Sequence, residues 1–137
     1  MANPERILLN DLQKAVYTAL SGNVGATVVD YAADTDFPVV LIGPYTQTGL
    51  GSKDQSPSEA MMQIDVFSES SGFKELNTIM DAVIVALTTT ELSLAGTSVA
   101  ISTGLEVAET LIDPPIDGRV IRHGMMQFRW FLVDNVK

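Results

Sequence analysis

The sequence predicts an α+β fold, in which two helices pack on a mainly antiparallel sheet. Apolar residues recur at helical spacing in two stretches, residues 4–21 and 73–87. Alternating or β-branched runs occupy much of the remainder, and short turns join them instead of the long crossovers that parallel strands need. The chain has 137 residues, which is about the length of one domain with one core. We therefore expect a single domain over residues 1–137.

The first helix is predicted from residue 4 to residue 21. Asn3 can cap a helix, Pro4 has no N–H to leave unpaired in a first turn, and Glu5 favours the positive end of the dipole. Gly22 lies where a left-handed cap ends a helix. Apolar residues recur three or four positions apart, at Leu9, Leu12, Val16 and Leu20. This helix should bury one face.

Two β-rich runs and a polar stretch follow the first helix. Residues 27–31 and 39–42 are rich in β-branched side chains and predict strands. Residues 44–58 are dominated by Gly, Pro and Ser, and they predict one long flexible loop. Loops of this length inside one domain are uncommon and are usually functional or disordered. From Glu59 to Phe67 the pattern alternates, which predicts a strand with one buried face.

The second helix is predicted over residues 73–87. Its first half is amphipathic, but after Asp81 it is apolar on all sides through Leu87. Such a segment is covered on more than one side. The sheet would supply one cover, and another subunit is an open candidate for the second.

The last third of the chain predicts strands. Residues 92–94 form a short one, and residues 97–111 form a longer one that Gly104 interrupts, as at a β-bulge. A turn over residues 113–118 precedes a long alternating strand, residues 120–133. From Met125 onward this strand is apolar on both faces, so we expect it to be central in the sheet or covered twice.

Residues that carry enzymatic chemistry are few. The chain has no cysteine and a single histidine, His123. With no carboxylate evident in its register, we expect a structural histidine instead of a general base. Asp30, Asp34 and Asp36 lack the glycine and closing glutamate of a calcium loop and predict a solvated acidic turn. No phosphate-binding loop or nucleophile motif occurs, so the residues themselves point to neither a catalytic site nor a metal site.

The charge is strongly acidic overall and basic at one end. Eight Lys and Arg oppose 17 Asp and Glu, and the formal charge is −9. This balance argues against non-specific nucleic-acid binding, and it favours the core over base stacking for Phe128, Trp130 and Phe131. Residues 119–137 are basic, which suits either head-to-tail contact between copies or ordinary surface pairing.

The sequence shows neither a membrane span nor a signal peptide. The longest apolar run, Ala82 to Leu87, is far shorter than the roughly 20 residues that a span needs. The N-terminal residues lack the apolar region of a signal peptide. We therefore expect no membrane partner, and a protein made and kept in a cytoplasm.

A set of short motifs follows one another along nearly the whole chain. They are LQKAVY (12–17), DY (30–31), FPVVLIG (37–43), MQIDVFS (62–68), a helix led by Gly72, DGR (117–119) and HGMMQFR (123–129). In their order and spacing these motifs resemble the tail-completion family of long-tailed bacteriophages and phage-derived gene transfer agents, which includes tail terminator, or tail-to-head joining, proteins.

The resemblance implies a structural virion protein without catalysis or cofactor. Family members form a homo-hexameric ring that caps the tail tube and meets the head connector at the tail–head junction, after assembly in the host cytoplasm. DNA passes through the lumen, where an acidic body would keep it from sticking. Two regions become candidates for partner contact. The first is a loop, Tyr45, Thr46, Gln47, Thr48, Gly49, Leu50, Gly51, Ser52, Lys53, Asp54 and Gln55, and the second comprises Arg119, Arg122 and Arg129.

Two alternatives to a terminator remain open. A tail-tube or neck protein of related fold would polymerise into open tubes, whereas a terminator would stop at a closed ring. A small cytoplasmic enzyme or ligand-binding protein would need a pocket with converging polar groups.

Overall fold

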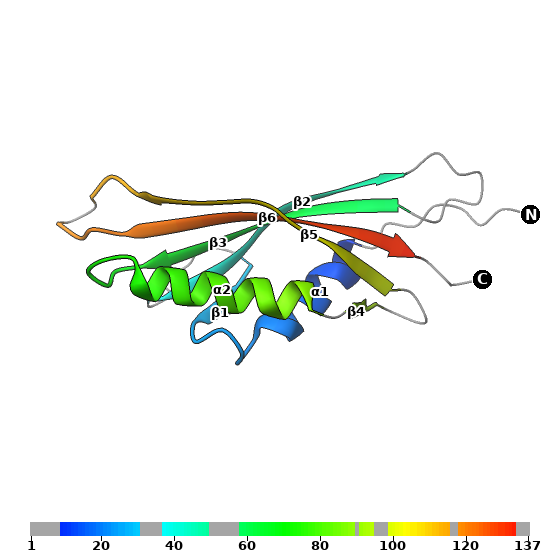
Figure 1. Cartoon of the computed structure of the whole chain (residues 1–137), viewed down its shortest axis with the longest axis horizontal. Helices are drawn as coiled ribbons and strands as arrows, with labels where there is room; N and C mark the ends of the chain where they lie inside the picture. The colour runs from blue at the N-terminus through cyan, green and yellow to red at the C-terminus, as the bar shows by residue number, and fades with distance from the viewer. Residues whose placement is uncertain are drawn as a thin grey trace, which may run out of the picture.

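The computed structural model describes residues 9–30, 37–49, 58–89, 91–94, 99–115 and 118–133 (Figure 1). Two helices and one sheet make up these residues. In chain order the elements are α1 (Leu9–Leu20), β1 (Thr27–Val29), β2 (Val39–Gly49), β3 (Ser58–Ser68), α2 (Lys74–Thr88), β4 (Leu92–Ser93), β5 (Val99–Ile112) and β6 (Arg122–Val133).

The sheet has six strands in the order β1-β2-β3-β6-β5-β4. The predicted α+β class with two helices is confirmed, but the expected mainly antiparallel sheet is corrected to a mixed one. The cause is β1, which runs parallel to β2, whereas the remaining neighbours pair antiparallel. The sheet is also strongly twisted, so its strands cross near the middle of the molecule in Figure 1.

Both helices lie against the same face of the sheet (Figure 1). Burial follows this arrangement, because alternate residues of β3 and β6 point at the helices and are buried. Fully burying one large apolar side chain contributes roughly 1.5–3 kcal/mol. The largest fully buried side chains are Trp130, Phe128, Leu12, Leu20, Met62, Ile64, Leu76, Leu87, Met126, Leu132 and Val16. The core therefore lies between the helices and one face of the sheet.

The two helices form close to where their patterns place them. α1 spans Leu9–Leu20, inside the predicted 4–21, and residues 1–8 lie outside the described residues. α2 spans Lys74–Thr88. Its inward residues Val83 and Leu87 are buried, but Val85 is 62% exposed. Within the described chain, the apolar second half of α2 packs on the sheet, its partly buried Ala82, Ile84 and Ala86 adjoin the core, and α2 also contacts α1, so only the side that carries Val85 is left open.

The flexible loop predicted at about 44–58 is wrong over its first residues. Residues through Gly49 belong to β2, and β3 begins at Ser58. The pairing runs from Tyr45 with Met62 to Gly49 with Ser58, so a ladder on β3 overrides the weak strand propensity of this Gly- and Thr-rich stretch. Pro44 lies at a register shift, where its missing N–H removes no regular ladder bond. Residues 50–57 lie outside the described residues.

The bulge predicted at Gly104 is confirmed. Gly104 has φ +113°, and the β5–β6 register shifts between Ser102 and Gly104 and again between Leu105 and Val107. β6 is central, as predicted, with β3 on one side and β5 on the other. The described helices cover it on one face only, and Phe131 on the other face is 38% exposed.

Candidate assembly surfaces

The sheet face opposite the helices, called the open face below, carries the polar and half-buried residues of the two central strands. Its side chains alternate with the buried ones and meet across the β3–β6 ladder, for example Phe67 opposite His123 and Glu59 opposite Phe131. On these strands it comprises Glu59, Met61, Gln63, Asp65, Phe67, His123, Met125, Gln127, Arg129 and Phe131.

His123 on the open face is held by two carboxylates. Its Nε2 lies 2.8 Å from Oδ1 of Asp65, and its Nδ1 lies 3.3 Å from Oδ1 of Asp113. The ring also stacks on Phe67, with centroids 4.4 Å apart. The expectation that His123 lacks a carboxylate in register is therefore wrong. Asp65 is 58 positions away in sequence, and only the β3–β6 register brings it close.

The surroundings of His123 suit a structural histidine better than a general base. Asp65 is only 5% exposed. Gln63 further engages this carboxylate, since its Nε2 donates to both oxygens at 3.0 and 3.3 Å. Both ring nitrogens of His123 already face a carboxylate, which leaves neither ready to take a proton from a substrate. The cluster ties β3 and β6 together.

Arg129 forms a charged row across the open face. Its Nη1 donates to Oε1 of Glu59 on β3 at 2.6 Å, and its Nε lies 3.0 Å from Oε1 of Glu106 on β5. One arginine thus links three neighbouring strands. Charged groups of opposite sign in adjacent strands each contribute modestly to sheet stability. Arg129 has partners within its own chain, although the sequence proposed it for contact with another protein.

Arg119 and Arg122 lie elsewhere, beside the turn between β3 and α2. Arg119 pairs with Glu69, to which its Nε donates at 3.1 Å. Arg122 donates from Nη1 to the carbonyl of Ser70 at 2.9 Å, and its guanidinium lies 5.1 Å from the ring centroid of Phe73. The three candidate arginines are therefore not one patch, because two secure the start of β6 and Arg129 crosses the middle of the sheet.

The candidate contact residues 45–49 alternate between the two faces of β2. Tyr45 faces α1, where its hydroxyl donates to Oε1 of Gln13 at 3.4 Å. Gln47 donates from Nε2 to Oγ of Ser58 at 3.2 Å. Thr46 and Thr48 are exposed and share the open face with their β3 partners. Gly49 ends the strand, and the remaining candidates, Leu50, Gly51, Ser52, Lys53, Asp54 and Gln55, lie outside the described residues.

Exposed apolar side chains gather on β5, outside the two regions that were predicted to make contacts. β4 pairs with Val99 and Ala100 only. The remainder of β5, residues 101–112, has β6 on one side and no described strand on the other. The apolar content of residues 101–112 was a signal in the sequence that could have marked this strand as a contact region. Its exposed large apolar residues are Ile101, Leu105, Val107, Leu111 and Ile112.

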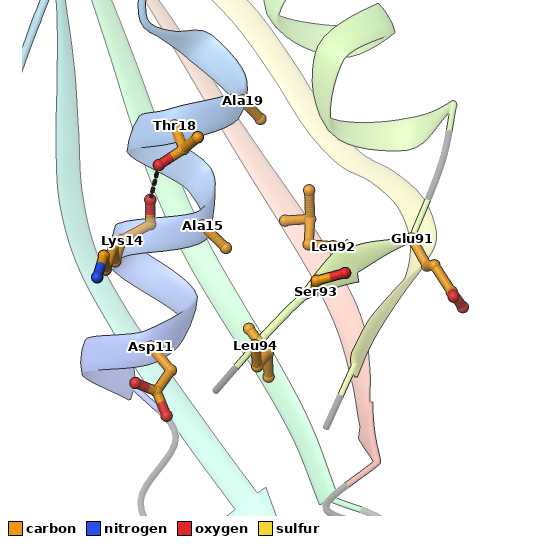
Figure 2. Close-up of a pocket in the computed structure, with 9 residues that line it drawn as sticks. All are labelled: Asp11, Lys14, Ala15, Thr18, Ala19, Glu91, Leu92, Ser93 and Leu94. Carbon is orange, nitrogen blue, oxygen red and sulfur yellow. Dashed lines mark hydrogen bonds between the residues drawn. The ribbon is translucent and has the colours of Figure 1, made fainter. Parts of the chain in front are cut away.

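A pocket of about 420 Å³ lies between α1 and β4 (Figure 2). Ala15 and Ala19 form its helix wall, with Leu92 on the strand side. The polar side chains of Lys14 and Glu91 point away from the hollow in Figure 2. Polar groups that fix a ligand should converge in a binding site, so this pocket does not favour the ligand-binding alternative.

Metal and membrane features are absent from the part of the chain that the structure describes. No group of three or more His, Asp or Glu residues there could hold a metal ion. Asp34 and Asp36, from the weak calcium pattern, lie outside the described residues, while Asp30 accepts a hydrogen bond from Gln13. No helix among the described residues is long and apolar enough to cross a membrane.

Comparison with known protein families identifies the chain as a virion protein of the tail-completion class. Residues 12–132 match the model of the family described as tail completion protein gp17. The chain belongs to this family, and the resemblance inferred from its motifs is confirmed. No curated protein sequence matches.

Two solved structures share the fold. A chain in the virion of a native gene transfer agent particle is 21% identical, with a TM-score of 0.69, and the match covers 95% of this chain and 100% of that one. The gp17 protein of bacteriophage SPP1 is 22% identical, with a TM-score of 0.59, and 93% of each chain is covered. The helices and the curled, mixed sheet therefore recur in virion proteins of low sequence identity.

Proposed function

We propose that this protein forms a homo-hexameric ring that caps the finished tail tube and joins it to the head connector. The observation that carries the proposal is the match to the tail-completion family over residues 12–132, nearly the whole folded chain. The protein acts by assembly and not by catalysis. Its histidine is occupied by two carboxylates, and the pocket at α1 lacks converging polar groups.

The open face is proposed to line the lumen through which DNA passes. Both helices cover the opposite face, so a ring with its helices outside turns the open face inward. The basic groups of this face are already engaged, Arg129 by Glu59 and Glu106 and His123 by two aspartates. A lining with its cations paired internally and acidic overall would repel phosphates and let DNA slide.

The end of the molecule where β2 stops and β3 starts is proposed to contact the tail tube. Tyr45–Gly49 lead to this end, and Thr46 and Thr48 are exposed there. Arg119 and Arg122 lie at the opposite end of β6 and are proposed to contact the connector. Because both already have partners in the chain, their contribution to that contact would be small and sensitive to salt.

The test adds purified protein to tails assembled without it and counts head-joined particles by electron microscopy. The proposal predicts that the intact protein restores joining. A variant with residues 50–55 deleted should fold, because those residues follow the last rung of the β2–β3 ladder, and it should restore little. Full restoration by the deletion variant would contradict the tail-tube assignment, and failure of the intact protein would contradict the function.

A further inference from the structure

We propose that neighbouring copies join by strand pairing, with the outer edge of β5 (residues 101–108) against the outer edge of β2 (residues 42–48). The sheet of one copy would then continue into the sheet of the next. The joint needs only a second copy of this chain. It rests on the proposed function and deepens it by naming the contact that builds the ring.

The β5 edge has the character of an interface strand. Its backbone beyond Ala100 has no described neighbour on the outer side. Ile101, Leu105 and Val107 are 44%, 37% and 39% exposed. Long, apolar, unpaired edges are templates for pairing, and monomeric proteins blunt them with charges or cover them. Glu106, the one charged residue of this stretch, is paired with Arg129 within the chain, so the edge keeps exposed apolar side chains and no unpaired charge to repel a partner strand.

The outer edge of β2 is the second surface of the proposed contact between copies. β1 pairs with Val39–Leu41 only, and the rest of β2 has no described neighbour on that side. Residues 42–49 carry no charged side chain, so nothing in them repels an approaching strand. Pro44 lacks an N–H and lies at the bulge, which places the main part of the joint on residues 45–48.

The two edges lie at the same level of the sheet. One row of the ladder joins Thr48, Glu59, Phe131 and Ile101 across the four long strands. A lower row joins Ile42, Ile64, Met126 and Ala108. The free parts of β2 and β5 therefore span the same rows. β1 borders the β2 edge only below these rows, and β4 borders the β5 edge only above them. Copies placed side by side would meet along these free parts.

Strand direction is also compatible with a ring. β2, β3, β6 and β5 alternate in direction, so β2 of a second copy fits beside β5 as one more antiparallel strand. The helices of both copies then lie on the same side, and no copy is inverted. Such a contact joins two different surfaces head to tail, which is the kind of interface that closes into a ring when the rotation permits.

Paired cysteines test the joint directly, because the chain has no cysteine of its own. Thr46 and Val107 both lie on the open face, opposite Met61 and Gln127. The double variants Thr46→Cys with Val107→Cys, Ile101→Cys or Glu109→Cys sample neighbouring registers on that face. Under oxidation, one or more of them should give a ladder of crosslinked chains that reducing agent abolishes.

The matched control moves one cysteine by a single position. Ala108 is exposed like Val107 but points to the helix face, opposite Met126. The two introduced thiols would then lie on opposite faces of the joined sheet, beyond disulfide reach. We expect at least roughly tenfold less crosslinking in Thr46→Cys/Ala108→Cys than in the best same-face pair. Equal ladders in both, or none in any same-face pair, would overturn the joint.

Lysine substitution supplies a second readout. Val107→Lys should remain folded, because Val107 is exposed, and should reduce assembly, because a charged side chain blunts an edge. Val85→Lys on α2 should assemble normally. The reverse result would overturn the joint in favour of α2. If same-face crosslinks form but the protein does not join tails to heads, the proposed function fails while the joint stands. If tails and heads join without same-face crosslinks, the joint fails while the proposed function stands.

Discussion

β5 and β6 are neighbours in the sheet and both are rich in apolar residues, yet their surroundings differ. In β6, alternate residues from Gly124 to Leu132 are buried, and strands flank it on both sides. In β5, most residues beyond Val99 and Ala100 are exposed or half-buried. Within one chain, the helix-facing residues of β6 are buried and both of its edges are paired, whereas β5 has apolar side chains and an edge that the described chain does not cover.

The difference separates residues that make the fold from residues that we propose to make the assembly. Substitutions of sheet residues that face the helices, or of helix residues that pack on them, should change the free energy of unfolding. Substitutions along β5 should change association and leave the fold intact. The same contrast recurs within single elements, between Leu87 and Val85 on α2 and between Trp130 and Phe131 on β6.

The largest effect is expected for Leu87→Asp. Leu87 is fully buried, and an unpaired buried charge costs several kcal/mol. Total stability for a chain of this length is about 7–20 kcal/mol, so the variant should be largely unfolded or strongly destabilised. Circular dichroism during urea titration measures this. Val85→Asp, two positions earlier, is the control and should unfold near the wild-type midpoint. A stably folded Leu87→Asp protein would contradict the core assignment.

A smaller loss is expected for Trp130→Ala. Trp130 is fully buried against the helices, and removing such a side chain costs about 3–5 kcal/mol. Phe131→Ala, its neighbour on the open face, should cost about 1 kcal/mol or less. Both free energies come from denaturant titrations. Equal losses would show that the open face is as well packed as the helix face, which would remove the contrast between the two sides of the sheet.

The smallest effect is expected for Arg129→Gln. The side chain is about one-third exposed and its two ion pairs are on the open face. Pairs of this kind contribute about 1 kcal/mol or less, and salt weakens them. The unfolding midpoints of the variant and the wild type should therefore differ slightly at low salt and converge at high salt. A loss above about 3 kcal/mol would mean that Arg129 is part of a buried network instead.

Local patterns were enough to predict the elements with strong periodicity. α2, β6 and the bulge at Gly104 follow from apolar spacing and from the conformational freedom of one glycine. The family also follows from the order of motifs, because order persists where identity is low. The strand from Tyr45 to Gly49 escaped prediction because its pairing with β3 overrides a turn-like composition.

Features that depend on pairing across the sheet could not be predicted. The contact of His123 with Asp65 requires the register of two strands far apart in sequence. The parallel pairing of β1 with β2 could not be predicted without knowing the path of the chain between the two strands. The exposure of β5 depends on which strand occupies the edge and how far β4 extends. Hydrophobic spacing alone does not distinguish an apolar edge from a buried strand.

The proposed ring is best tested by the mass of the intact protein in solution, from light scattering after size exclusion, with negative-stain images of the same fractions. We expect a closed ring with the mass of six chains, formed alone or when tail tubes are added. A chain that remains monomeric at high concentration and with tail tubes present would contradict it. Open-ended tubes would contradict it as well and would assign the protein to the tail tube.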